Sequence, residues 1–162
     1  MKALLALLPL AILLTACGAP SKDDFVAKAE EAGEFEIGSS RLAKNKSQNP
    51  AVTQFADQMI SDHTAAAEKL RAVAHLQGVG SDKANVLSPA HQADMDKLEK
   101  ATVAEFDALY IDVQTKAHED AVELFKSYGE DGDDAQLKQF AAQTLPTLEA
   151  HLAHVRSLKQ AH

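Results

Sequence analysis

The chain has 162 residues, 46% of them hydrophobic and 25% charged, with a formal net charge of −8 at pH 7. This length suits one domain with its own core. The acidic excess argues against nucleic-acid binding, which depends on Lys and Arg that neutralise phosphates. A single Cys excludes an internal disulfide and a thiolate metal cluster.

The N-terminus has the pattern of a secretory signal peptide. Lys2 precedes an apolar run, residues 3–14, which is too short for a transmembrane helix of about 20 residues. The following Leu14-Thr15-Ala16-Cys17 resembles the lipobox of bacterial lipoprotein precursors. That resemblance implies that residues 1–16 are removed and that Cys17 is lipidated, which would attach the protein stably to a membrane.

The mature chain would keep 15 basic and 24 acidic residues, which gives a formal charge of −9. The lipid, rather than a basic protein surface, would therefore attach the protein to the membrane. Residues 17–22 form the lipidated N-terminus and a short leash. Gly18, rather than Asp, follows the Cys, and this resembles the outer-membrane sorting pattern. We therefore expect a cell-envelope protein that faces the periplasm, in the outer rather than the inner membrane.

Residues 23–160 read as one helical domain, rich in Ala, Leu, Glu, Lys and Gln, without alternating strand patterns. Ser21 begins the first helix, Asn49-Pro50 separates the first two, and Gly78 ends the second. Pro146 interrupts the last helix, where we expect a kink. The predicted main helices span residues 23–46, 50–77, 103–127 and 134–159, with a loop at 78–87 and a turn at 129–133.

A short connector helix is expected to start at Ser88-Pro89. A bend between Glu99 and Glu105 would separate it from the third main helix, because one helix from there to Tyr128 would be about 60 Å long. The predicted fold class is all-α: a ferritin-like four-helix bundle with this connector helix between helices two and three. Simple up-down packing is the alternative to a connector that crosses the bundle.

Each predicted helix carries a polar side chain on its apolar stripe. Glu36 and His63 lie at almost equal sequence distances before and after Asn49. In an antiparallel hairpin that turns at Asn49, the two side chains therefore lie at the same level. In the second hairpin, pairing residue 127 with residue 134 places Tyr110 level with His151. The inward polar residues are Glu36, His63, Asp107, Tyr110, His118 and His151.

Two interpretations of this layer remain open. Its members can satisfy one another as a buried hydrogen-bonded network, in an envelope protein whose surface binds a partner protein. Alternatively they bind a zinc, copper or iron ion, because facing helices of a bundle supply imidazole and carboxylate ligands. The candidate ligands are Glu36, His63, His118 and His151, with Asp62, Asp107 and Tyr110 as supporting residues. No nucleophile motif is present, so nucleophilic catalysis has no support, and the sequence favours a protein without enzyme activity over an enzyme.

Several motifs resemble one bacterial family, the domain of unknown function 4142, described as predicted outer-membrane or ferritin-like proteins. They recur in order along residues 23–158: Phe25-Val26, Glu36-Ile37, Met59 with Asp62-His63, Phe106-Asp107 with Tyr110, His118-Glu119, and Leu145-Pro146-Thr147-Leu148 with His151. The resemblance implies a ferritin-like helical bundle and no established activity. Val103 departs from the Gly that is usual there in the family.

Di-iron chemistry of the ferritin class is disfavoured. Those bundles place a Glu three residues before a His on two helices. Here Ile60, Thr115 and Leu148 occupy the positions before His63, His118 and His151. A mononuclear or His-rich site is therefore the form of metal binding that the sequence permits, with Met59 as a conceivable soft ligand one turn from His63.

Overall fold

The computed structural model describes residues 19–76 and 86–161. Within them the fold is all-α, with five helices and no strand: α1 Lys22–Lys46, α2 Pro50–Leu76, α3 Pro89–Lys100, α4 Val103–Asp131 and α5 Ala135–Ala161. In this described part, no helix is both long and apolar enough to cross a membrane. The predicted signal peptide, Cys17 and most of the predicted loop 78–87 lie outside it.

Local side-chain caps explain where the helices begin. The Ser21 hydroxyl accepts a hydrogen bond from the Asp24 amide, and Asn49 Oδ1 accepts one from the Ala51 amide at 2.9 Å. The chain leaves the helical conformation at residues 101–102, inside the interval where the bend was predicted. Thr102 and Glu105 form a reciprocal capping box there, which starts α4 without a Gly or Pro.

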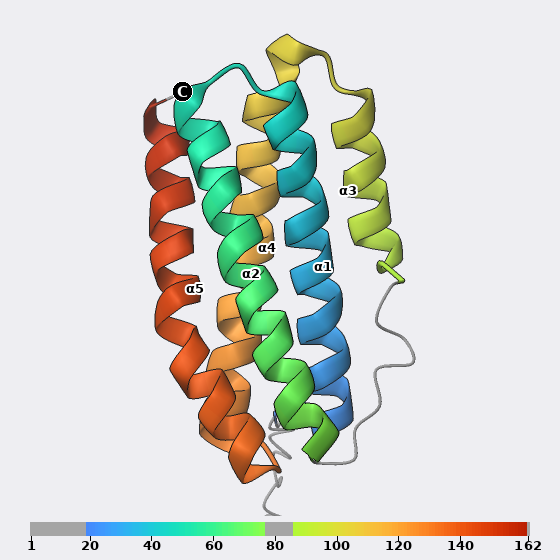
Figure 1. Cartoon of the computed structure of the whole chain (residues 1–162), viewed down its shortest axis with the longest axis vertical. Coiled ribbons are helices and arrows are strands. Elements are labelled where there is room, and N and C mark those ends of the chain that lie inside the picture. The colour runs from blue at the N-terminus through green and yellow to red at the C-terminus, as the bar shows by residue number, and fades with distance from the viewer. Residues whose placement is uncertain (1–18, 77–85, 162) are drawn as a thin grey trace, which may run out of the picture.

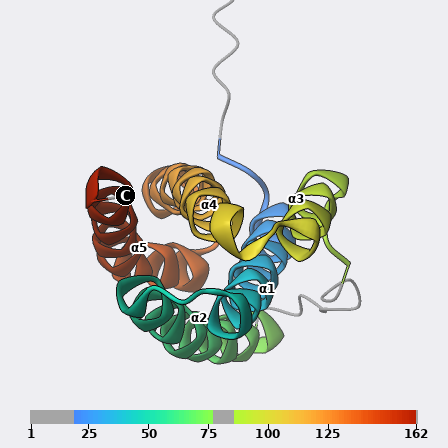
Figure 2. The ribbon, with the colours of Figure 1, turned by 90° about the horizontal axis from the view of Figure 1, so that it is seen from above.

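Four long helices surround the core (Figure 2). α1 packs against α2 and α4, and α5 packs against the same two helices. Figure 1 shows that α2 and α4 run in the same direction, antiparallel to α1 and α5. The shorter α3 lies outside this group, against α1, and runs opposite to α2 and α4. It therefore returns the chain along the length of the molecule between α2 and α4.

The predicted turn at residues 129–133 is placed too early, because α4 continues to Asp131. Gly129 is a helical residue that permits close packing: a Cβ there would lie 3.4 Å from the backbone nitrogen of Ala142 on α5. The helix ends where the Gly132 amide donates to the Tyr128 carbonyl. This later turn shifts the register of α4 against α5, so His118, not Tyr110, lies beside His151.

The core consists of two apolar clusters with a polar layer between them. On α1, Phe25, Val26 and Ala29 belong to one cluster and Phe35 and Ala43 to the other, with Glu36 near the boundary. His63, His118 and His151 occupy the corresponding boundary on α2, α4 and α5. α5 passes through Pro146 as one helix and carries His151 beyond it. The fold thus brings one buried polar side chain from each long helix to one level.

Candidate metal centre

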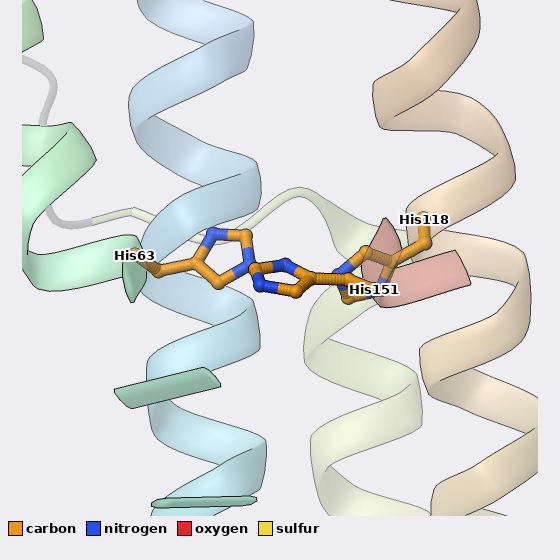
Figure 3. A group of neighbouring side chains, drawn as sticks. All are labelled: His63, His118 and His151. Carbon is orange, nitrogen blue, oxygen red and sulfur yellow. The ribbon is translucent and has the colours of Figure 1, made fainter. Parts of the chain in front are cut away.

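Three imidazole rings meet in this polar layer. His63 comes from α2, His118 from α4 and His151 from α5, and they extend toward one another across the core (Figure 3). Their ring centroids are 5.4 to 5.5 Å apart, and one ring nitrogen of each lies within 4.8 Å of one nitrogen of the other two. The residues are 6%, 0% and 1% exposed, so bulk water does not hydrate them.

Each ring is held by one hydrogen bond from one of its nitrogens. His63 Nδ1 lies 2.9 Å from Glu36 Oε2, and His151 Nε2 lies 2.9 Å from Asp62 Oδ2. His118 Nδ1 lies 2.9 Å from the main-chain carbonyl oxygen of Gln114, one turn earlier on α4. Because carboxylates and carbonyls only accept, these ring nitrogens are the donors. Both the orientation of each ring and the position of its proton follow from these bonds.

The second nitrogen of each ring has no hydrogen-bond partner. These atoms are Nε2 of His63, Nε2 of His118 and Nδ1 of His151, and all three are buried. Buried polar atoms are nearly always satisfied, so three such atoms in one cluster call for an explanation. A purely structural polar network would pair them. A group that accepts electron pairs from all three nitrogens at once would explain them instead.

The arrangement fits a transition-metal ion. Imidazole ligands lie about 2.0 to 2.1 Å from zinc or copper, so two of them at a tetrahedral ion are about 3.4 Å apart. Nitrogens that lie within 4.8 Å of one another would reach this spacing if each moved inward by less than about 1 Å. Metal-binding His residues usually donate their other ring proton to a carboxylate or carbonyl, as these three do.

Burial and charge set the protonation of the cluster. Burial, the largest single influence, would raise the pKa of Glu36, but the charges of His63 and His118 and the His63 hydrogen bond together lower it to about 2. Burial also acts to lower the pKa of His63, yet the Glu36 charge and hydrogen bond outweigh it and raise that pKa. Burial dominates at His118 and His151 and lowers the pKa of each.

Five of the seven predicted site residues come together. The polar layer contains Glu36, His63, His118 and His151. Asp62 accepts a hydrogen bond from the ring of His151. Glu36 was predicted as a ligand, but its Oε2 accepts from His63 Nδ1, so it orients that ring from the side opposite the unpaired nitrogen. Its role in this geometry is that of a supporting residue.

Asp107 and Tyr110 do not contact the rings, contrary to the prediction. The Tyr110 hydroxyl bonds to Ser40 Oγ at 2.8 Å, and burial raises the pKa of that phenol. Asp107 precedes His118 by eleven positions on α4, about 16 Å along the helix axis. Both were placed near the site by the hairpin register, which the longer α4 changes.

Gln114 is the contributor that the sequence reasoning missed. Besides its carbonyl bond to His118, its side-chain amide donates to Ser39 Oγ at 2.9 Å, which ties α4 to α1 just beside the layer. The signal was its position four residues before His118, where a ring nitrogen can reach the carbonyl of the preceding turn. Met59, the conceivable soft ligand, is fully buried within the apolar cluster formed with Phe55 and Val52.

Comparison with known proteins places the chain in a family. Residues 14–158 match the sequence model of the family described as Domain of unknown function (DUF4142). The chain belongs to this family. The resemblance of its motifs to that family is thereby confirmed. No curated protein matches the sequence of this DUF4142 chain.

Several solved structures share the fold of this DUF4142 domain. The DUF305 fragment from Deinococcus radiodurans has a TM-score of 0.77 and 14% identity, and the match covers 90% of this chain and 99% of that one. A putative secreted DUF305 protein from Streptomyces coelicolor has a TM-score of 0.70 and 16% identity, covering 85% and 90%. CopM in the Cu(II)-bound form has a TM-score of 0.74 and 15% identity, covering 88% and 98%. At these identities the likeness establishes the fold alone.

Proposed function

We propose that this domain binds one transition-metal ion through His63, His118 and His151. The observation that carries this proposal is a set of three buried His rings, each with one ring nitrogen that lacks a partner and each offering a nitrogen within 4.8 Å of those of the other two. Three protein ligands leave a position for a further ligand in a four-coordinate site. Glu36, Asp62 and the Gln114 carbonyl would hold the rings in place.

Copper is the metal that we favour. Imidazole suits copper, zinc and iron, and among divalent first-row ions Cu(II) binds such sites most tightly. A protein of the same fold, CopM, is known in a Cu(II)-bound form, which supports copper without transferring its ligands to this chain. We also infer that the fold is a four-helix bundle of ferritin-like topology with α3 as the crossing connector; the parallel directions of α2 and α4 support this inference.

Metal analysis of the purified protein tests the proposal. We expect about one equivalent of copper per chain after dialysis against Cu(II), and loss of that copper in His63→Ala. Asp62→Ala should weaken binding about ten- to a hundredfold, because the His151 ring loses its acceptor. Asp57→Ala, which removes an exposed acid of the same helix that pairs with Lys44, is the matched control and should bind normally. Folded wild-type protein that holds no copper, zinc or iron would refute the site.

The alternative, an interaction or stress-associated protein with a structural polar layer, makes the opposite prediction. In that case His63→Ala would change stability but no metal content would exist to be lost. A structural layer should also use its polar atoms, whereas the three unpaired nitrogens are unused by any described protein group. This difference is why the metal site is the function that the geometry supports best.

We further propose that lipid on Cys17 anchors the domain in the cell envelope, facing the periplasm, with the outer membrane favoured. The support is the lipobox-like Leu14-Thr15-Ala16-Cys17 after an apolar run, and the short distance from Cys17 to the start of α1 at Lys22. The leash would keep the metal layer within one molecular length of the bilayer.

Metabolic labelling with palmitate tests the anchor. The wild-type protein should incorporate the label and fractionate with membranes, whereas Cys17→Ser should incorporate none and leave the membrane fraction, since no helix in the described residues could replace the lipid. A Ser40→Ala variant changes a hydroxyl far from the N-terminus and should still be labelled. Unlabelled wild-type protein in the soluble fraction would rule the anchor out.

A further inference from the structure

A small cavity adjoins the histidine layer on its side nearer the start of α1. It measures about 30 Å³ and is walled by all four long helices. Most of the wall is small or apolar, including Ala32, Gly33, Ala66 and Phe125, while Glu36 and His63 form its polar part. About 10 to 15 Å³ suffices for one water, so the cavity has room for a molecule of one or two heavy atoms.

Two residues of this wall carry a buried polar atom without a hydrogen-bond partner, Glu36 at Oε1 and His63 at Nε2. Glu36 is 1% exposed, and its Oε1 makes no hydrogen bond, while Oε2 accepts from His63. His118 Nδ1 lies 3.4 Å from Oε1 but donates its hydrogen bond to the Gln114 carbonyl oxygen. A buried carboxylate oxygen is costly to leave unsatisfied, so this atom needs a donor from outside the protein.

The cavity also has a wall in common with the surface. A hollow of about 320 Å³ between α2 and α5 is lined by Asp62 and Thr147, and it shares Ala66, Phe140 and Thr144 with the cavity. These three side chains are the ones that line both the cavity and the surface hollow. The Thr144 hydroxyl already donates to the Phe140 carbonyl, so the partition presents little polar hindrance to a small neutral molecule.

We infer that this cavity, whose polar lining is Glu36 and His63, binds a small neutral hydrogen-bond donor, water or hydrogen peroxide, on Glu36 Oε1. In the metal-loaded protein the inference rests on the proposed function, because His63 lines the cavity and is also a proposed metal ligand. Size limits the ligand to one or two heavy atoms. The carboxylate repels small anions, and the wall is apolar apart from Glu36, His63 and Thr144, so a small neutral donor is the class that fits.

Filling the cavity without removing any side chain tests the inference. Gly33 is suited to this, because a Cβ added there meets no heavy atom within 4 Å and no ligand residue is altered. Crystals of the metal-free full-length protein, soaked in hydrogen peroxide, should show a bound molecule within hydrogen-bond distance of Glu36 Oε1. Gly33→Leu should lose it, whereas the matched control Ala150→Leu, on the exposed side of α5, should keep it. An empty wild-type cavity, or a molecule retained in Gly33→Leu, would overturn the inference.

A second measurement uses the copper-loaded protein. Water exchanging next to Cu(II) speeds the relaxation of bulk water protons, so we expect Gly33→Leu to lower this relaxivity at least twofold while its copper content equals that of wild type. Equal relaxivity at equal copper content would contradict the inference. Failure of the wild type to bind any metal refutes the proposed function instead, and the metal-free crystals then still decide whether the cavity holds its ligand.

Discussion

Glu36→Ala should lower the free energy of unfolding of the metal-free protein by about 3 to 5 kcal/mol, measured by urea denaturation. The carboxylate is buried and lies 2.9 Å from His63 Nδ1 and 3.4 Å from His118 Nδ1. Removing it leaves the His63 ring buried without its acceptor or its counter-charge, which is the costly way to break a buried pair. The loss is large because the whole stability of a domain is commonly only about 5–15 kcal/mol.

Glu34→Ala is the matched control, since Glu34 lies on the same helix and pairs with Arg71 at 2.9 Å, but both side chains are partly exposed. That surface pair should contribute no more than about 1 kcal/mol. Glu36→Gln keeps the size and an acceptor oxygen and should retain part of the lost stability. If Glu36→Ala costs no more than Glu34→Ala, the buried pair does not hold the layer together.

The same pair predicts a dependence on acid. The pKa of Glu36 is lowered from 4.5 to about 2, so its contribution is complete above about pH 4.5 and is lost as the pH falls through 2. The difference corresponds to about 3 kcal/mol, in agreement with the cost expected for Glu36→Ala. Stability curves of wild type and Glu36→Gln should therefore converge as the pH falls from 4.5 toward 2.

Much of the fold follows from local signals in the sequence. Asn49 and Pro50 mark the hairpin between α1 and α2, and nearly equal sequence distances on either side of Asn49 bring Glu36 and His63 to one level. In the structure these two side chains are 2.9 Å apart. The break before α4 was also predictable, from length alone, and Thr102 with Glu105 supplies its cap.

The register of α4 against α5 could not be read in the same way. Gly129 and Gly132 both suggest a turn, and only packing distinguishes them: a Cβ at Gly132 would lie 2.6 Å from the Tyr128 carbonyl oxygen, whereas a Cβ at Gly129 would meet Ala142 at an ordinary contact distance of 3.4 Å. The resulting shift moves His118 to His151 and leaves Tyr110 with Ser40. The apolar face of each helix thus predicted which side chains point into the core, but it did not predict which of these side chains contact one another.

The functions of the two oxygens of Glu36 were equally hidden. Helical periodicity places this side chain inward, and an inward carboxylate beside three His residues reads as a metal ligand. Only the structure shows that Oε2 accepts from Nδ1 of His63 while Oε1 is buried without a hydrogen-bond partner. Gln114 contributes mainly through its main-chain carbonyl, a group that every residue carries and that composition cannot reveal.

Binding of Cu(II) should release a proton from His63, and affinity should fall steeply in acid. The ring nitrogens bind metal only when unprotonated. Burial acts to lower the pKa of His63, but the charge and hydrogen bond of Glu36 outweigh it and raise that pKa, so of the three rings this one holds its extra proton most firmly and must give it up to the metal. The pKa values of His118 and His151 are lowered by burial, so these rings are already neutral and release none.

Each His that is protonated in the free protein lowers the apparent affinity tenfold per pH unit. The pKa of His63 is raised, so below it the apparent affinity for Cu(II) falls tenfold for each unit of pH. The pKa values of His118 and His151 are lowered, so only at more acidic pH do all three rings become protonated, and the fall then approaches a thousandfold for each unit of pH. Calorimetric titrations in two buffers of different ionisation enthalpy measure the proton count, and competition with a chelator from pH 8 to 5 measures the slope. Release of three protons at pH 7 would mean that His118 and His151 are charged in the free protein, which their burial opposes. If Cu(II) binding releases no proton and its affinity is the same at pH 8 and pH 6, His63 is not a ligand. The reason is that His63, the ring paired with the buried Glu36 carboxylate, is the ring that must give up its proton to the metal.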